Sequence, residues 1–122
     1  MKMGETRVMV RMHGPKGYQD VEIVADTGAT LTMIPEQVAD SLGIVTQGRL
    51  TIRLADGRTK AVPMGNAEIE IGGDRAPVRV LIGSEDVALL GLTALETLGL
   101  KVNPVDRRVE PAVFSQYALS PY

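Results

Sequence analysis

Apolar and polar residues alternate along several segments of the chain, with the period of two that is typical of half-buried β-strands. The alternating segments are residues 8–12, 21–25, 50–54, 67–71 and 78–82. Turn-forming sequences separate them, among them Gly14-Pro15-Lys16-Gly17, Asp56-Gly57 and Gly72-Gly73-Asp74. The pattern therefore predicts a mostly antiparallel, all-β chain.

Two short helices are expected to interrupt the strands. The first should begin near Pro35, a residue suited to the first helical position, and end at Gly43. The second contains Thr93-x-x-Glu96, which fits a capping box, and should end at Gly99. An apolar strand that breaks at a glycine precedes each helix, which indicates a faint internal duplication of strand, turn and helix.

The length and charge of the chain limit its organisation and its partners. The 122 residues are predicted to form a single domain, residues 1–122, with a core at about 6–110 and a C-terminal tail at 111–122. A net charge of -2 argues against nucleic acid and anionic membranes as partners. No apolar run approaches the roughly 20 residues that span a bilayer. The start of the chain does not resemble a signal peptide, so a cytoplasmic location is the default expectation.

Residue types that are absent or rare narrow the chemistry. The chain has no cysteine, which excludes disulfides, thiolate zinc sites and cysteine nucleophiles. Its single histidine, His13, precedes a turn and is interpreted as a solvated turn residue, which disfavours a Ser-His-Asp triad or a histidine-rich zinc site. No metal or other cofactor is expected. If the chain is a hydrolase, carboxylates are the remaining candidates for its catalytic groups.

An acidic residue stands at the end of the strand predicted at 21–25. In Val24-Ala25-Asp26-Thr27-Gly28-Ala29-Thr30, an apolar strand leads Asp26 into a turn that contains a glycine and two hydroxyls. A carboxylate in this position costs free energy unless it is hydrogen-bonded or paired. One interpretation is an Asx-type turn, in which Asp26 only caps the loop. The other is a catalytic carboxylate, and the surrounding sequence has to distinguish the two.

Further elements follow this turn in a characteristic order. They are a flap-like hairpin around Asp56-Gly57, a pair of strands through Ile71 and Val80, and Leu89-Leu90-Gly91 before a short helix. Over residues 8–103 this arrangement resembles the single-domain retropepsins, the retroviral-type aspartic proteases, and especially their cellular and prokaryotic relatives. The resemblance implies a retropepsin-like closed β-barrel or sandwich with a flap hairpin, and aspartic endopeptidase activity.

By this resemblance, Asp26 is one half of a catalytic pair in a homodimer with a shared active site. The chain has one Asp-Thr-Gly, so the second carboxylate must come from a second subunit related by a two-fold axis. Two carboxylates about 3 Å apart share a proton, and a water activated between them attacks the peptide carbonyl. The resemblance assigns Thr27 to a hydroxyl contact across the dimer, and Gly28 to a close approach of its N–H to the carboxylate. The remaining aspartates lack this context and are predicted to be solvated: Asp20, Asp40, Asp74, Asp86 and Asp106.

The resemblance also implies which residues meet a peptide or protein substrate. Ala29 has no hydroxyl where pepsin-like enzymes have a serine, which predicts a pH optimum nearer weakly acidic or neutral pH. Thr30 replaces an acidic residue with which retroviral enzymes hold the substrate backbone. The flap is expected near the substrate, although its charged residues depart from the glycine-rich, apolar tips of retroviral flaps; it comprises Leu54, Ala55, Asp56, Gly57 and Arg58. Residues expected to line subsites are Ile82, Val87 and Leu89, and Leu89-Leu90-Gly91 is expected to support Asp26.

Other interpretations stay open. A retropepsin-like fold can be a catalytically silent dimerisation or peptide-binding module. An unrelated small β-barrel can carry Asp-Thr-Gly as an ordinary turn. The tail holds Phe114, Tyr117 and Tyr122, and it is either part of the dimer interface or a loosely ordered terminus.

Overall fold

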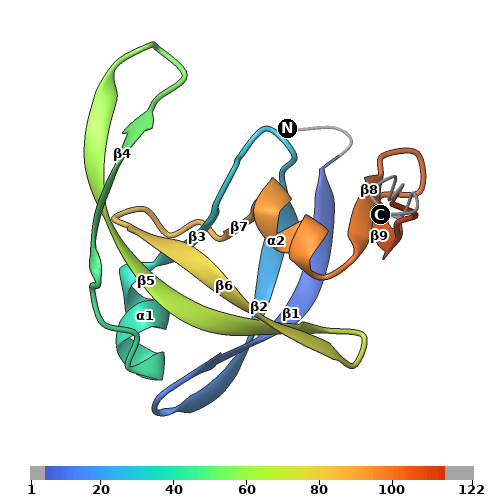
Figure 1. Cartoon of the computed structure of the whole chain (residues 1–122), viewed down its shortest axis with the longest axis horizontal. Coiled ribbons are helices and arrows are strands. Elements are labelled where there is room, and N and C mark those ends of the chain that lie inside the picture. Colours follow the sequence, from blue (N-terminus) through green and yellow to red (C-terminus); the bar gives the residue numbers. More distant parts are fainter. Residues whose placement is uncertain (1–4, 115–122) are drawn as a thin grey trace, which may run out of the picture.

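The computed structural model describes residues 5–114, which form strands and two short helices (Figure 1). In chain order the elements are β1 (Thr6–Gly14), β2 (Gly17–Ala25), β3 (Thr32–Pro35), α1 (Glu36–Leu42), β4 (Gly48–Arg53), β5 (Thr59–Ile71), β6 (Asp74–Gly83), β7 (Leu89–Leu90), α2 (Leu92–Thr97), β8 (Leu100–Asn103) and β9 (Arg108–Pro111). The predicted all-β class with short helices is confirmed. The proposed role of Tyr117 and Tyr122 lies outside the described residues.

Seven of these strands form one sheet in the order β1-β2-β7-β3-β6-β5-β4. β1 also pairs with β5, between residues 11–13 and 68–70, so the order returns to its first strand and β4 is attached outside this ring. Most pairs are antiparallel, as predicted, but β2 with β7 and β3 with β6 are parallel. The sequence pattern did not predict the four-residue β3, because so short a strand has no measurable alternation.

The apolar faces of the alternating segments meet in one hydrophobic core. Val10 and Met12 of β1, Ile23 of β2, Ile69 of β5 and Val80 of β6 are fully buried. Both helices pack apolar side chains on this core, namely Val38, Ala39, Leu42, Ala94 and Leu95. Aliphatic side chains therefore provide the burial that stabilises the fold, at roughly 1.5–3 kcal/mol for each large one.

The two helices differ from their predicted starts. Pro35 is the N-cap residue of α1 with an extended backbone (φ -65°, ψ 152°), and the helix begins one residue later. In α2 the N-cap residue is Gly91, so the capping box predicted from Thr93 and Glu96 is wrong. Because the helix already begins at Leu92, Thr93 lies inside it and donates its hydroxyl to the carbonyl oxygen of Thr30 at 2.9 Å.

The helix ends agree with the sequence. Gly43 and Gly99 follow the two helices with left-handed φ angles of 72° and 69°. Glycine adopts this conformation without the steric cost that a side chain brings.

The predicted flap is present as a hairpin that projects from the body of the molecule (Figure 1). It consists of β4 and the first half of β5, which pair from Gly48↔Met64 to Arg53↔Thr59. β5 is the only sheet neighbour of β4 among the described residues, so the other edge of β4 is unpaired. An unpaired edge can accept another extended chain.

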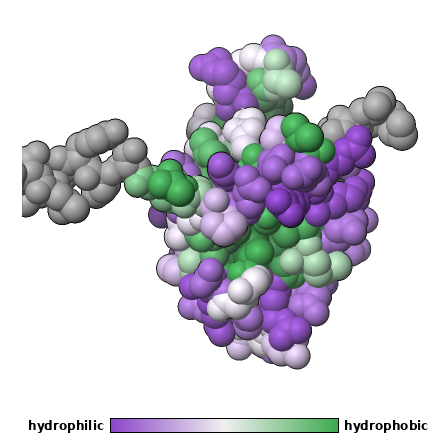
Figure 2. Space-filling model, turned by 90° about the vertical axis from the view of Figure 1, so that its right-hand side faces the viewer, coloured by the Kyte–Doolittle hydropathy of each residue, from purple (hydrophilic) through white to green (hydrophobic). Residues whose placement is uncertain are grey.

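The C-terminal hairpin of β8 and β9 forms a separate two-stranded sheet. Apolar residues reach the surface between hydrophilic areas on the face shown in Figure 2. Val105, Val113 and Phe114, in and just after this hairpin, are exposed. Within residues 5–114, no helix has the length and apolar character needed to cross a membrane.

Candidate active site

Asp26 is placed by the parallel pairing of two short apolar segments. It directly follows β2, whose Val24 and Ala25 pair with Leu89 and Leu90 of β7. The ladder continues into the loop, because the N–H of Asp26 donates to the carbonyl oxygen of Leu90 at 3.0 Å. β7 thus fixes the backbone of Asp26, as the expected supporting role of Leu89-Leu90-Gly91 requires.

The turn after Asp26 holds one oxygen of its carboxylate. The N–H of Gly28 donates to Asp26 Oδ1 at 2.9 Å, and the N–H of Ala29 donates to the Asp26 carbonyl oxygen at 3.0 Å. A Cβ on Gly28 would lie 3.1 Å from Oδ1, tighter than ordinary contacts, so glycine suits this position. The geometry is that of an Asx-type turn. It engages only Oδ1, and Oδ2 has no hydrogen-bond partner within residues 5–114.

Hydrogen bonds join the segment that follows Asp26, residues 29–32, to the start of α2. The N–H of Leu92 donates to the Ala29 carbonyl oxygen at 2.8 Å, and the N–H of Thr93 donates to that of Thr30 at 3.1 Å. The buried hydroxyl of Thr32 accepts the N–H of Gly91 at 3.0 Å. The start of α2 therefore holds the 29–32 segment in place.

Replacing Gly91 by alanine is expected to destabilise the fold by about 1–3 kcal/mol. The added Cβ would lie 2.4 Å from the carbonyl carbon of Leu31 and 2.7 Å from the amide nitrogen of Thr32, and both are backbone atoms that cannot move aside alone. Urea unfolding measures the loss. Gly57→Ala is the matched control, because its Cβ meets nothing within 4 Å although its φ of 87° adds some strain. Equal stability of Gly91→Ala and wild type would contradict this account.

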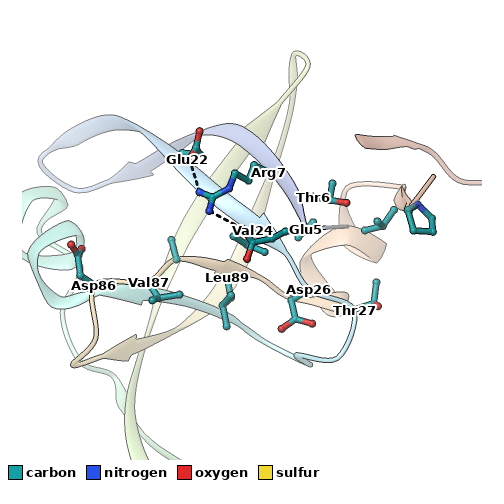
Figure 3. Close-up of a pocket in the computed structure, with 14 residues that line it drawn as sticks. Glu5, Thr6, Arg7, Glu22, Val24, Asp26, Thr27, Asp86, Val87 and Leu89 are labelled. Atoms are coloured by element: carbon teal, nitrogen blue, oxygen red, sulfur yellow. Dashed lines mark hydrogen bonds and ion pairs between the residues drawn. The ribbon is translucent and has the colours of Figure 1, made fainter. Parts of the chain in front are cut away.

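Two depressions meet beside Asp26. The first has a volume of about 740 Å³, and Asp26 and Thr27 line it together with Val87 and Leu89, two of the predicted subsite residues (Figure 3). The second, of about 460 Å³, is lined by Gly28, Ala29 and Thr30. Leu89 lines both depressions. The structure thus brings most of the predicted loop residues and two predicted subsite residues to one place.

The second depression contains residues that the sequence did not assign to the site. These are Leu31, Met33, Leu50, Thr51, Ile52, Arg53 and Leu81. Ile82, predicted to line a subsite, is instead buried in the core, and its neighbour Leu81 faces the depression. The period of two in β6 explains the correction, since Ile82 shares a face with the core residues Val78 and Val80. The alternation of apolar and polar residues in the sequence of β6 could therefore have shown that Ile82 faces the core.

The predicted flap tip does not line either depression in this structure. Residues 54–58 form a tight turn, exposed from Ala55 to Arg58, in which the N–H of Gly57 donates to the Leu54 carbonyl oxygen at 2.9 Å. Asp56 pairs with Arg58 at 2.6 Å, which satisfies the two charges within the tip. The strand that precedes the tip, residues 50–53, is the part of the hairpin that reaches the site.

The charges around the first depression are unequal. Arg7 bridges Glu5 at 2.7 Å and Glu22 at 2.9 Å. The hydrogen bond to Glu22, together with the charge of Glu5, raises the pKa of Arg7 above its ordinary value, so its guanidinium stays charged.

Within residues 5–114, no cluster of three or more histidine, cysteine, aspartate or glutamate residues could hold a metal ion. All five aspartates predicted to be solvated are exposed.

The fold resembles that of known retroviral proteases. The EIAV protease in complex with the inhibitor HBY-793 superposes with a TM-score of 0.64 at 19% identity, covering 81% of this chain and 92% of that one. The simian foamy virus (mac) protease superposes with a TM-score of 0.57, also at 19% identity, covering 74% of this chain and 91% of that one. No curated protein sequence matches the chain.

Sequence comparison identifies the family. Residues 13–97, more than half of the chain, match the family model described as "gag-polyprotein putative aspartyl protease". The matched segment contains Asp26, the flap hairpin and Leu89-Leu90-Gly91. Membership of a cellular or prokaryotic branch stays a prediction. With this match and the retroviral-protease fold, the chain belongs to the gag-polyprotein aspartyl protease family and is a retropepsin-like protein.

Proposed function

We propose that this protein is an aspartic endopeptidase that acts as a homodimer, with Asp26 of each subunit forming one shared catalytic pair. The observation that carries the proposal is the placement of Asp26. It lies beside two depressions, in a loop fixed by β7 and α2, with one carboxylate oxygen held by Gly28 and the other free of partners within residues 5–114. Family membership supports the reaction class.

The second carboxylate has to come from another copy of the chain. The six other aspartates among the described residues are exposed and do not share the Asp-Thr-Gly loop. A two-fold axis beside Asp26 would bring two identical loops together. Thr27 is exposed, and its hydroxyl has no hydrogen-bond partner in the described part of the chain, which leaves it available for a contact between the loops. Exposed Val105, Val113 and Phe114 supply further apolar surface for association.

The reaction follows from two carboxylates that share one proton. Like charges in close contact cannot both be ionised cheaply, so one carboxyl keeps a proton and the other is a base. The ionised carboxylate accepts a proton from a water that attacks the peptide carbonyl carbon, while the protonated one gives its proton to the carbonyl oxygen. As the C–N bond then breaks, the amine nitrogen takes the proton that came from water, and a hydroxyl of the intermediate returns a proton to the other carboxylate. Gly28 orients the carboxylate through Oδ1 at 2.9 Å.

An extended peptide fits between the active-site loop and the flap hairpin. The free edge of β4 offers backbone hydrogen-bonding groups, and residues 50–53 face the second depression across from Ala29 and Thr30. Backbone bonds to such an edge hold a peptide irrespective of sequence, and pockets select alternate side chains. The flap tip, with its charged pair Asp56–Arg58, is then placed over or beside the substrate.

The concentration dependence of activity tests the shared site. We expect the cleavage rate of an internally quenched peptide library to rise with the square of chain concentration below the dimer dissociation constant, and linearly above it, because only dimers hold both carboxylates. A statine-type inhibitor should abolish the activity in both regimes. Sedimentation measured over the same concentrations supplies the dimer fraction.

A linear dependence at all concentrations, with a strictly monomeric chain, would contradict the proposal. A dimer that binds peptides and cleaves none of them would favour the catalytically silent binding module instead.

A further inference from the structure

The first depression combines an apolar wall with a charged rim. Val24, Val87 and Leu89 supply partly exposed aliphatic surface next to Asp26. Figure 3 shows Asp86, Val87, Leu89 and Asp26 following one another along one side, with Arg7 on β1, Glu22 on β2 and Glu5 just before β1. The depression thus has apolar surface close to the catalytic carboxylate, and charged side chains surround the depression.

The charged residues of the rim leave an excess of negative charge. Three carboxylates, Glu5, Glu22 and Asp86, stand against one guanidinium, Arg7, which is a formal charge of -2 before Asp26 is counted. Arg7 is already engaged by Glu5 and Glu22, so its positive charge is compensated locally. Asp86 is exposed and has no ion-pair partner among residues 5–114. This carboxylate is therefore available to a ligand.

We infer that the first depression binds the side chain of a lysine or arginine beside the scissile bond of the substrate, and that Asp86 is a specificity-determining residue. The inference rests on the proposed function. Lysine and arginine have long aliphatic stems and a terminal cation. The stem covers the apolar wall formed by Val24, Val87 and Leu89, and the cation reaches the acidic rim. Sequence alone had predicted only a solvated role for Asp86.

The second depression is mostly apolar, which narrows the substrate sequence that we expect. Its lining includes Leu31, Met33, Leu50, Ile52 and Leu81, and Arg53 is its only charged member among the described residues. Side chains of an extended peptide alternate between opposite faces. A substrate that spans both depressions should therefore alternate basic and apolar residues. Two-fold symmetry repeats both depressions on the other side of the bond.

Matched peptides test the inference. We would measure kcat/KM for peptides that differ only in one residue flanking the scissile bond, which is lysine, norleucine or glutamate. For the wild type we expect about a fivefold preference for lysine over norleucine at low salt, and glutamate as the poorest of the three. Raising the salt from about 0.02 M to about 0.5 M should erase most of this preference.

Asp86→Asn should lower the lysine-to-norleucine ratio about two- to fivefold, and Asp86→Lys should reverse the preference. Asp40→Asn is the matched control, since it removes a carboxylate on α1 that is also exposed and lines neither depression. A wild-type ratio near one, or equal ratios in Asp86→Asn and wild type, would overturn the inference while leaving protease activity intact.

Binding to Asp26→Asn separates this inference from the proposed function. We would compare fluorescein-labelled lysine and norleucine peptides by anisotropy with this variant, which needs no cleavage. Tighter, salt-sensitive binding of the lysine peptide supports the basic-residue depression even if no peptide is ever hydrolysed. Equal binding of the two peptides overturns it.

Discussion

Asp26→Asn is expected to reduce kcat/KM for peptide cleavage by about 10²- to 10⁴-fold, the usual contribution of a positioned general acid or base. An amide cannot take the proton of the attacking water, yet it can still accept the Gly28 N–H that Asp26 Oδ1 accepts at 2.9 Å. The loop should therefore keep its conformation. Circular dichroism and urea unfolding should agree closely with the wild type, so that the loss is chemical and not structural.

The matched control is Asp74→Asn, which changes an exposed carboxylate at the start of β6 that lines neither depression. It should cleave peptides like the wild type. Equal cleavage by Asp26→Asn and wild type, on the other hand, would point to a contaminating protease.

Mixing the inactive variant with wild type extends this test to the dimer. If each active site needs Asp26 from both subunits, an equimolar mixture has about a quarter of its dimers fully wild type, and activity at constant total concentration falls to about a quarter. A site complete in each subunit would give about half. The two outcomes differ by a factor of two, which progress curves resolve.

Leu90→Ala is expected to lower the free energy of unfolding by about 2–5 kcal/mol. The Leu90 side chain is 0% exposed and belongs to the core, so truncation removes buried surface and leaves a cavity. Its carbonyl oxygen also accepts the N–H of Asp26, so the truncated residue is one that holds the backbone of the active-site loop. Urea unfolding at fixed protein concentration, with an unchanged m-value, measures this loss.

Leu92→Ala provides the comparison for that measurement. Leu92 is two residues away at the start of α2 and 40% exposed, so the same truncation should cost well under half as much. If the two variants were equally stable, Leu90 would not be the support of the loop. A catalytic loss in Leu90→Ala larger than its loss of folded protein would show that β7 also orients the carboxylate.

Much of the fold was predictable because it depends on local pattern. The alternation around Val10, Ile23 and Ile69 places those residues in the core, since a strand with one buried face has to repeat with a period of two. Gly43 and Gly99 mark the helix ends because their backbones are left-handed. The position of Asp26 at the end of β2 followed from the same local reasoning.

The capping of α2 and the lining of the second depression were not predictable in this way. Thr93 has the spacing of a capping residue, but β7 ends at Leu90 and makes Gly91 the N-cap, because the adjacent backbone at Leu31 leaves no room for a side chain there. Contacts between residues some sixty positions apart override the local preference.

The sequence by itself predicted the alternating strands and the helix ends, and it indicated Asp26 as the candidate catalytic residue. Only the tertiary structure decided what surrounds that residue. The parallel pairing of Val24 and Ala25 with Leu89 and Leu90 joins distant segments, and the register of β6 turns Leu81 toward the site and Ile82 into the core. Such arrangements depend on which strands become neighbours and in which register they pair. The pairing minimises the free energy of the whole sheet, so no single segment of the sequence encodes it.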